Sequence, residues 1–274
     1  MRLSSGETII HCGRDDDRHI HRVVIMMSKN SAKSLIDWTP VSERIISARY
    51  FSNHVKMTLI NAYAPTNDAS DDVKDQFYQS LTEIVQRTPR HDMLVITGDL
   101  NAKVGNNPSQ YENVMGRHGL GVMNENGERL CDFCAMNELL ITGTLFPHRD
   151  IHKATWVSPD GDTKNQIDHV LINKRFRTSV RDTRAYRGPD VASDHFLIIS
   201  TLKLKLRAAP KAEKPRVRYN TDKLKNTDIK RQFCVELRNR YQTLAEVNGD
   251  VDDADNDTIE TKKQDNRISI LRNR

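Results

Sequence analysis

The chain has 274 residues, of which 37% are hydrophobic and 29% are charged, so it is long enough for one sizeable α/β domain with an appendage. No apolar run reaches the length of a membrane span, and the first residues contain no signal-peptide core. Lys and Arg number 42 against 37 Asp and Glu, which gives a net charge of +5 and an isoelectric point near 9.0. This excess suits a polyanionic partner, but an ordinary solvated basic surface also explains it.

Apolar runs in the first hundred residues predict strands, and a 3.6-residue spacing then predicts a helix. The strands are predicted at 22–28, 44–50 and 56–63. The helix is predicted over 72–87, with Asp71 or Asp72 as its N-cap. Its inward face is expected to contain Val73, Phe77, Leu81, Ile84 and Val85.

The next hundred residues continue the alternation of strands and helices. A buried strand is predicted at 93–97, before a loop over 101–127 that is rich in Gly and Asn. A helix follows near 126–138. Further strands are predicted at 139–142, 155–157, 167–172 and 196–204. This alternation indicates an α/β fold with stacked sheets.

Four cysteines are scattered along the chain, which is typical of a protein in a reducing, intracellular compartment. Cys131 and Cys134 form a C-x-x-C pair inside a helical pattern, and no second pair accompanies them. We interpret them as half-buried helix cysteines, with a zinc site as the alternative.

The composition changes after residue 206. Residues 207–227 are basic, contain prolines and are expected to form a linker. An amphipathic helix is predicted over 228–246, and the acidic tail at 247–274 is expected to be disordered.

Three aspartates lie at predicted strand ends, each beside a polar partner. They are Asp99, Asp168 and Asp194. Carboxylates at the ends of neighbouring strands can converge, and oxygen ligands are those that Mg²⁺ prefers. The Asn101 amide can donate to a phosphoryl oxygen, and His195 can donate too if Asp168 fixes its tautomer. The pattern therefore favours phosphodiester chemistry.

Each of these residues also has a purely structural interpretation. Asp99 could cap a turn, and Asp168 could be a salt-bridge partner. Tyr63 and Trp156 could be core aromatics, with the Tyr63 hydroxyl at the rim. We expect His169 to be structural, packed or hydrogen-bonded at the sheet edge.

Four short motifs in a fixed order resemble the endonuclease/exonuclease/phosphatase superfamily. They are Asn61-Ala-Tyr-Ala-Pro65, Gly98-Asp-Leu-Asn101, Gln166-Ile-Asp-His169 and Ser193-Asp-His195. Further runs resemble its LINE-type retrotransposon branch, the endonuclease–reverse transcriptase polyproteins. They are Met115-Gly-Arg-His-Gly-Leu-Gly121, Asn124-Glu-Asn-Gly-Glu-Arg129 and His152-Lys-Ala-Thr-Trp-Val-Ser-Pro-Asp160. The resemblance covers residues 1–206.

This resemblance implies an α/β sandwich of two packed, mostly antiparallel sheets with helices outside. It implies Mg²⁺-dependent phosphodiester cleavage of DNA, with Mn²⁺ as the alternative ion. An intracellular, nuclear location is expected. Neither a membrane nor a small-molecule cofactor is expected, and the sequence leaves the oligomeric state open.

The resemblance also implies roles for individual residues. Asp99 would position or deprotonate the attacking water, and Asn101 would hold the phosphate. Tyr63 would support the scissile phosphate or the leaving group. The substrate contacts would be Asn61, Arg117, His118 and Trp156.

The metal and the transition state would be held by the last two motifs. Asp194 would bind the metal ion or lie near it, and His195 would stabilise the transition state while Asp168 orients its ring.

The family places an Asn on its first strand and a metal-binding Glu on its second, and both precede the region matched here. We therefore expect a truncated relative whose first strands are missing and whose activity is weak or absent. One alternative is a non-catalytic remnant that binds nucleic acid or protein. Another is a phosphatase of the phosphoinositide type, which the retrotransposon-like runs disfavour.

Overall fold

The computed structural model describes residues 1–13, 22–188, 193–204 and 220–248. By its internal contacts the chain divides into two units, Met1–Arg207 and Ala208–Arg274. All the described strands lie in the first unit, and the described part of the second contains helix α4 (Thr227–Asn248). None of the described helices is long and apolar enough to cross a membrane.

The predicted carboxyl-terminal segments are described in part. Helix α4 covers the segment predicted to be helical, 228–246. The predicted basic linker falls outside the described residues as far as position 219, and its last part contains a short 3₁₀ helix, Thr221–Lys225. The predicted acidic tail falls outside them from position 249 onward.

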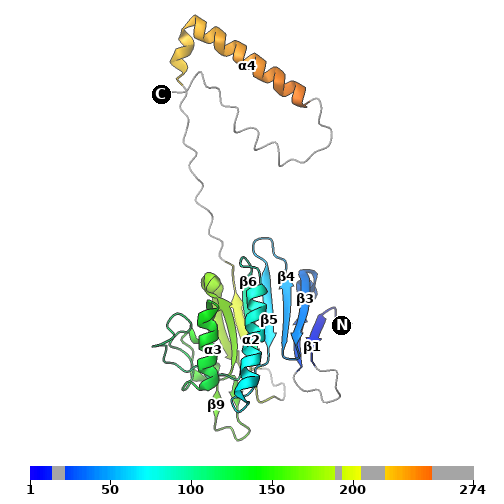
Figure 1. Cartoon of the computed structure of the whole chain (residues 1–274), viewed down its shortest axis with the longest axis vertical. Helices are drawn as coiled ribbons and strands as arrows, with labels where there is room; N and C mark the ends of the chain where they lie inside the picture. Colours follow the sequence, from blue (N-terminus) through cyan, green and yellow to red (C-terminus); the bar gives the residue numbers. More distant parts are fainter. Residues whose placement is uncertain (14–21, 189–192, 205–219, 249–274) are drawn as a thin grey trace. The chain divides into compact units, whose positions relative to one another are not determined.

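A six-stranded sheet forms the centre of the first unit (Figure 1). Its strands in spatial order are β3 (Leu35–Ser42), β4 (Ile45–Tyr50), β5 (Met57–Ala62), β6 (Met93–Asp99), β10 (Asp168–Asn173) and β7 (Leu139–Ile141). Strands β5 and β6 are parallel, and the other neighbours are antiparallel. A parallel pair needs a crossover, which α2 (Asp71–Arg87) supplies. The carboxyl ends of β5 and β6 therefore meet at one edge of the sheet.

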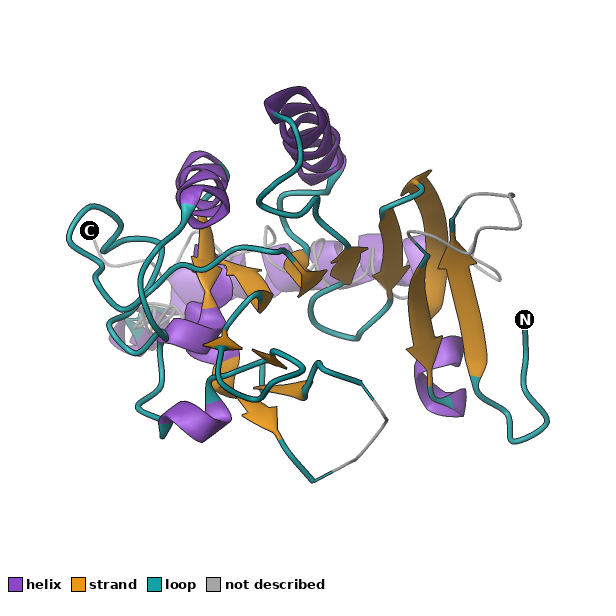
Figure 2. Cartoon of the chain, turned by 90° about the horizontal axis from the view of Figure 1, so that it is seen from below, coloured by secondary structure: helices purple, strands orange, loops and turns teal. Residues whose placement is uncertain are grey.

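Helices α2 and α3 (Glu125–Met136) lie side by side on one face of this sheet (Figures 1 and 2). Phe77 and Leu81 of α2 and Phe133 of α3 are buried against strand residues such as Ile96. Because a strand's side chains alternate between its faces, the remaining strand residues point to the opposite face.

Two details of α2 differ from the prediction. The N-cap is Ser70, whose backbone is extended, and not Asp71 or Asp72. Both aspartates occupy the first helical turn, where the helix dipole favours negative charge. Val73 is 42% exposed, so the buried face is narrower than expected at its amino-terminal end.

The opposite face of the central sheet carries two separate two-stranded sheets. They pair β1 (Thr8–Cys12) with β2 (Val23–Met27) and β11 (Val180–Tyr186) with β12 (Leu197–Leu202). The first packs over β4, and the second packs over β6 and β10. Met57 and Leu59 of β5 contact both clusters and are half-buried. The predicted α/β class with stacked sheets is confirmed, and its second β layer is in two parts.

Several buried polar groups of the first unit have structural roles. Cys131 and Cys134 are free thiols that are fully buried, not half-buried as predicted, because the loop residues Val114 and Met115 join their cluster. His169 is buried, and its Nε2 lies 2.7 Å from the carbonyl oxygen of Ala102.

The remaining described α-helix and strands are α1 (Lys29–Lys33), β8 (Trp156–Val157) and β9 (Lys164–Asn165).

Candidate active site at the edge of the central sheet

The two strand ends that carry Asp99 and Asp168 lie next to each other. Strand β6 ends at Asp99, β10 begins at Asp168, and the antiparallel register pairs these residues directly. Directly opposed residues on one face of a sheet are close neighbours. The convergence predicted for these strand ends is therefore present in the structure.

His195 contacts Asp168 through its Nδ1 atom. Nδ1 lies 3.0 Å from Oδ2 and 3.2 Å from Oδ1 of the carboxylate. This hydrogen bond raises the pKa of His195 above its ordinary value, although partial burial of the ring opposes the shift. The contact orients the ring and leaves Nε2 for a ligand. The structure therefore places Asp168 where it can orient His195.

Asp99 is the most perturbed carboxyl of this edge. Its pKa is raised to about 6, first by burial and then by the neighbouring negative charge of Asp168. The backbone N–H of Asn101 donates to Oδ1 over 2.9 Å and partly offsets the shift. Asp99 thus caps a turn, which is the structural role considered for it from the sequence. It is also a base whose pKa lies near neutral.

The cluster of Asp99, Asp168 and His195 has the composition of a divalent-cation site. One ligand atom from each residue lies within 4.8 Å of the others. Mg²⁺ is usually bound through one or two carboxylates together with substrate phosphates, and Mn²⁺ also accepts these ligands. A cation would also neutralise the two adjacent carboxylates. The residues present therefore fit such an ion.

Asp194, the expected metal ligand, is not in this group among the described residues. Its Oδ2 accepts a hydrogen bond of 2.7 Å from the indole N–H of Trp156, which lowers the pKa of the carboxyl. The backbone reinforces this contact, because Trp156 forms a β-bridge with His195. The indole N–H of Trp156, a residue predicted to contact DNA, is therefore bound to Asp194.

Thr155 is a site residue that the sequence does not indicate. Its buried hydroxyl oxygen accepts hydrogen bonds from the backbone N–H groups of Ile167 and Asp168, over 3.0 and 3.1 Å. These bonds fix the backbone at the start of β10. A lone Thr before a Trp gives no signal of such a role, because the contact is formed only in the folded chain.

The other predicted residues near this edge make structural contacts. The Nδ2 group of Asn101 donates to the carbonyl oxygen of Ala64, and that of Asn61 donates to Val24, each over 2.9 Å. A side-chain amide has two N–H groups, so Asn101 keeps one for a ligand. Tyr63 is half-buried, and its backbone continues from the end of β5 toward Asp99.

The loop that carries Arg117 and His118 is attached beside β10. The backbone N–H of Leu120 donates to the side-chain oxygen of Gln166, two residues before Asp168. Arg117 is exposed, and neither its side chain nor that of His118 contacts the acidic cluster within the described part of the chain. The loop thus lies near this edge, but the structure does not bring these two side chains into the cluster.

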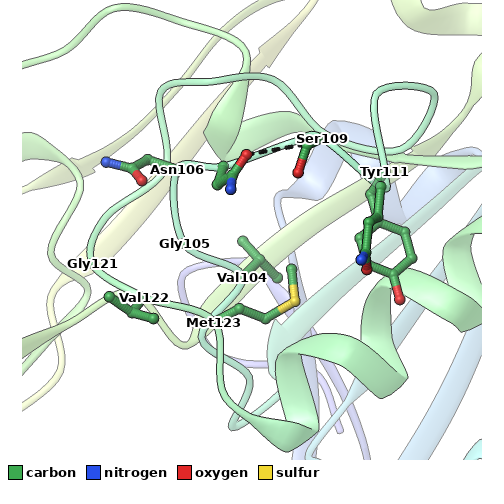
Figure 3. A pocket seen from close by; sticks show the side chains of 10 residues that line it. Val104, Gly105, Asn106, Ser109, Tyr111, Gly121, Val122 and Met123 are labelled. Carbon is green, nitrogen blue, oxygen red and sulfur yellow. Dashed lines mark hydrogen bonds between the residues drawn. The ribbon is translucent and has the colours of Figure 1, made fainter.

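A cavity of about 410 Å³ opens in the loop that follows Asn101. Figure 3 shows Val104 and Met123 between Asn106 and Tyr111. None of its lining residues is charged or belongs to the acidic cluster. We therefore place the candidate site at the sheet edge and not in this cavity.

The site motifs lie within a segment that matches a known family model. Residues 57–199, which include Asp99, Asp168 and His195, match the family described as endonuclease-reverse transcriptase. The chain belongs to the endonuclease-reverse transcriptase family. Membership in this family confirms the resemblance to the endonuclease–reverse transcriptase proteins inferred from the motifs.

Two curated relatives are craniofacial development protein 2 of Bos taurus and of Tragulus javanicus. The first is 36% identical over 227 residues, which cover 83% of this chain and 38% of the relative. The second is 37% identical over 212 residues, covering 77% of this chain and 36% of the relative. The chain therefore spans less than two fifths of the length of either relative.

Solved structures share the fold of this family member at low sequence identity. The endonuclease domain of TRAS1, a telomere-specific non-LTR retrotransposon, matches with a TM-score of 0.52 at 14% identity and covers 73% of this chain and 82% of that domain. The 3′-5′ exonuclease NExo of Neisseria meningitidis matches with a TM-score of 0.53 at 19% identity, covering 73% and 80%. These matches identify the endonuclease/exonuclease fold.

Proposed function

We propose that this family member hydrolyses phosphodiester bonds in DNA as an endonuclease dependent on a divalent metal ion. The observation that carries the proposal is the meeting of Asp99, Asp168 and His195 at one sheet edge, with ligand atoms within 4.8 Å of one another. A base with a pKa near neutral and an oriented imidazole are two groups that phosphodiester hydrolysis needs.

In the proposed reaction Asp99 accepts a proton from the attacking water, whose oxygen bonds to phosphorus while the bond from phosphorus to a sugar oxygen breaks. The leaving sugar oxygen takes up a proton from solvent. His195, held by Asp168, donates a hydrogen bond from Nε2 to the phosphate oxygen on which negative charge develops. The free N–H of Asn101 binds a second phosphate oxygen. Mg²⁺ or Mn²⁺, held by the carboxylates of this edge, would neutralise charge on the phosphate as a Lewis acid.

Two observations support DNA as the substrate. The chain carries a net charge of +5, which favours a polyanion. One solved neighbour with the same fold, a 3′ phosphatase NExo variant from Neisseria, is described as bound to a product DNA hairpin. Because DNA is the proposed substrate, we also propose a nuclear location. Imaging of a tagged chain tests this location.

A nicking assay on supercoiled and abasic DNA, with Mg²⁺ or with EDTA, tests the proposal. We expect nicking that needs the metal and that Asp99→Ala abolishes, because the substitution removes the base. Glu83→Gln, which changes a carboxylate on the exposed face of α2, is the control and should nick like the wild type. Equal nicking by Asp99→Ala and the wild type would contradict the proposal. The nicking rate of the wild type also tests the expectation, made from the missing first strands, that the activity is weak or absent.

A second candidate is a chain that binds DNA without cleaving it. The observation in its favour is that Asp194 is bound by Trp156 and that the described metal-binding cluster has only two carboxylates. Binding of the same DNA in Mg²⁺ without any nicking would favour this candidate. Phosphate release from phosphoinositides, with no action on DNA, would instead favour the phosphatase alternative.

A further inference from the structure

Three arginines in the described part of the chain lie over aromatic rings. The distances from guanidinium carbon to ring centroid are 5.3 Å for Arg44 over Tyr63, 5.6 Å for Arg175 over Phe176 and 4.6 Å for Arg187 over Phe196. Such contacts hold a guanidinium group in place without neutralising its charge. The three arginines differ in their position on the fold and in their other partners.

Arg44 is held by neighbouring protein groups, and Arg175 lies far from the acidic cluster on the central sheet. Arg44 donates to the carbonyl oxygen of Tyr63 and lies 3.9 Å from a carboxylate oxygen of Glu43, with 17% of its side chain exposed. It thus ties the start of β4 to the end of β5. Arg175 follows the end of β10, whereas Asp168 is at the start of that strand. Arg175 therefore lies at the opposite edge of the central sheet from the acidic cluster.

Arg187 lies at the same edge as the candidate site. It follows Tyr186, the last residue of β11, which pairs with Leu197 at the start of β12. Its aromatic partner Phe196 directly follows His195, and the Phe196 backbone N–H donates to the carbonyl oxygen of Thr155 over 2.7 Å. The hydroxyl of Thr155 in turn holds the backbone of Asp168, so short links connect Arg187 to the cluster.

The charge of Arg187 is available to a ligand. The side chain is exposed, and within the described ranges it forms no salt bridge. The neighbouring cluster is acidic and repels a DNA backbone. A bound metal ion neutralises the carboxylates but does not hold the phosphates on either side of the scissile one. An arginine is suited to that task, because its planar fork of N–H donors matches phosphate oxygens and stays charged.

We propose that Arg187 binds a phosphate of the DNA backbone beside the acidic cluster, held in place by the ring of Phe196. The inference rests on the proposed function in taking DNA as the ligand. It goes beyond that function by adding a phosphate subsite outside the four motifs.

Binding of a labelled DNA duplex to the full chain in EDTA tests this subsite, with fluorescence anisotropy measured from 50 to 200 mM NaCl. Each phosphate contact contributes about 0.9 to the slope of log affinity against log salt. We expect Arg187→Gln to make this negative slope shallower by about 0.9. Between 50 and 200 mM NaCl, the fold-loss of affinity should then be about threefold smaller for Arg187→Gln than for the wild type. Arg187→Lys keeps the charge and should keep the slope.

Arg175→Gln is the matched control, because it removes an arginine that also lies over an aromatic ring but at the opposite sheet edge. It should bind with the wild-type slope. The inference would be overturned if Arg187→Gln and the wild type had equal slopes, or if Arg187→Gln and Arg175→Gln made the slope shallower by equal amounts. It would also be overturned if the wild type did not bind the duplex. Because the assay contains no metal and no cleavage step, a chain that fails to nick DNA can still show the Arg187 effect. A chain that nicks DNA without that effect overturns this inference alone.

Discussion

At the scale of single residues, the candidate site depends on how burial and neighbouring charges distribute protons among three side chains. Burial and Asp168 raise the pKa of Asp99 to about 6, while the same Asp168 raises the pKa of His195 by a hydrogen bond. One carboxylate therefore makes its neighbour a better base and the imidazole a better hydrogen-bond donor.

Asp168→Asn tests this arrangement directly. The pKa of His195 should fall, because the substitution removes the carboxylate whose hydrogen bond is the largest cause of the raised value. Cleavage should fall by at least about 100-fold, since a misoriented His195 no longer donates its hydrogen bond to the phosphate oxygen on which negative charge develops. NMR titration of the His195 ring in EDTA measures the first effect. An unchanged pKa would mean that Asp168 does not orient the ring.

The sequence indicated some of these residues and not others. Asp99, Asp168 and His195 could be predicted, because each lies in a short motif at a strand end. Thr155 and Arg187 could not, because their roles come from contacts across strands that no local pattern records. The contact between Asp194 and Trp156 was missed for the same reason.

At the scale of elements, the close approach of β5 and β6 positions Asp99. Gly98 has a φ of +137°, and a Cβ there would overlap the carbonyl oxygen of Ala62. Glycine is required at such a position because it has no Cβ. The residue before Asp99 therefore sets how closely the two strands meet.

Gly98→Ala should destabilise the chain by about 3 kcal/mol, through backbone strain together with the overlap. Gly161→Ala is the control, because Gly161 also has a positive φ of +80° but has open space around it. We expect it to cost about 1 kcal/mol, from strain alone. Urea unfolding measures both. Equal losses would show that the contact with Ala62 is unimportant.

Asp92 links three neighbouring strands from the residue before β6. It accepts two hydrogen bonds from Arg49 of β4, over 2.7 and 3.1 Å, and one from Thr58 of β5, over 3.0 Å. Burial raises its pKa, but these bonds outweigh burial, so the net pKa is lowered from 3.8. A lowered pKa means that the carboxylate stabilises the folded state above about pH 4, and that this contribution is lost as pH falls through the folded value.

Asp92→Asn should therefore lower the free energy of unfolding at pH 7 by about 2 kcal/mol, because it removes the charge that Arg49 binds. The difference from the wild type should shrink as the pH falls from about 4 through the lowered pKa of Asp92, because the folded wild-type carboxylate then loses its charge. Chemical unfolding at both pH values measures this. A difference that stays constant with pH would rule out the carboxylate charge as its cause.

The buried elements could be predicted better than the exposed ones. Strands β4, β5 and β6 are apolar runs, and α2 and α3 have clear helical spacing. Strand β3 was missed because most of its residues are exposed and it contains Pro40, which an edge strand tolerates. Strand β11 was missed because arginines occupy its outward positions.

At the scale of the whole molecule, the sequence predicted an α/β fold with stacked sheets but not how the second layer is divided. Strands β1–β2 and β11–β12 form separate sheets over the two halves of the central sheet. Which strands pair is set by long-range contacts, whereas local patterns specify only that a strand exists. The divided layer leaves Met57 and Leu59 half-buried between its two parts.

Metal-dependent cleavage of DNA is the function that we propose for the sheet edge holding Asp168 and His195. The first unit offers a matched control, because His148 and Asp182 form another His–Asp pair, with Nε2 2.6 Å from Oδ1. This second pair is not part of the described metal-binding cluster. Substituting either histidine removes a similar contact, but only one lies in the candidate site.

The most direct measurement is the rate at which the full chain nicks supercoiled DNA in Mg²⁺, compared among the wild type, His195→Ala and His148→Ala. We expect that His195→Ala lowers the rate by at least about 100-fold, that His148→Ala nicks like the wild type, and that EDTA abolishes nicking in all three. Nicking by His195→Ala at the wild-type rate, or no metal-dependent nicking by the wild type, would contradict the claim.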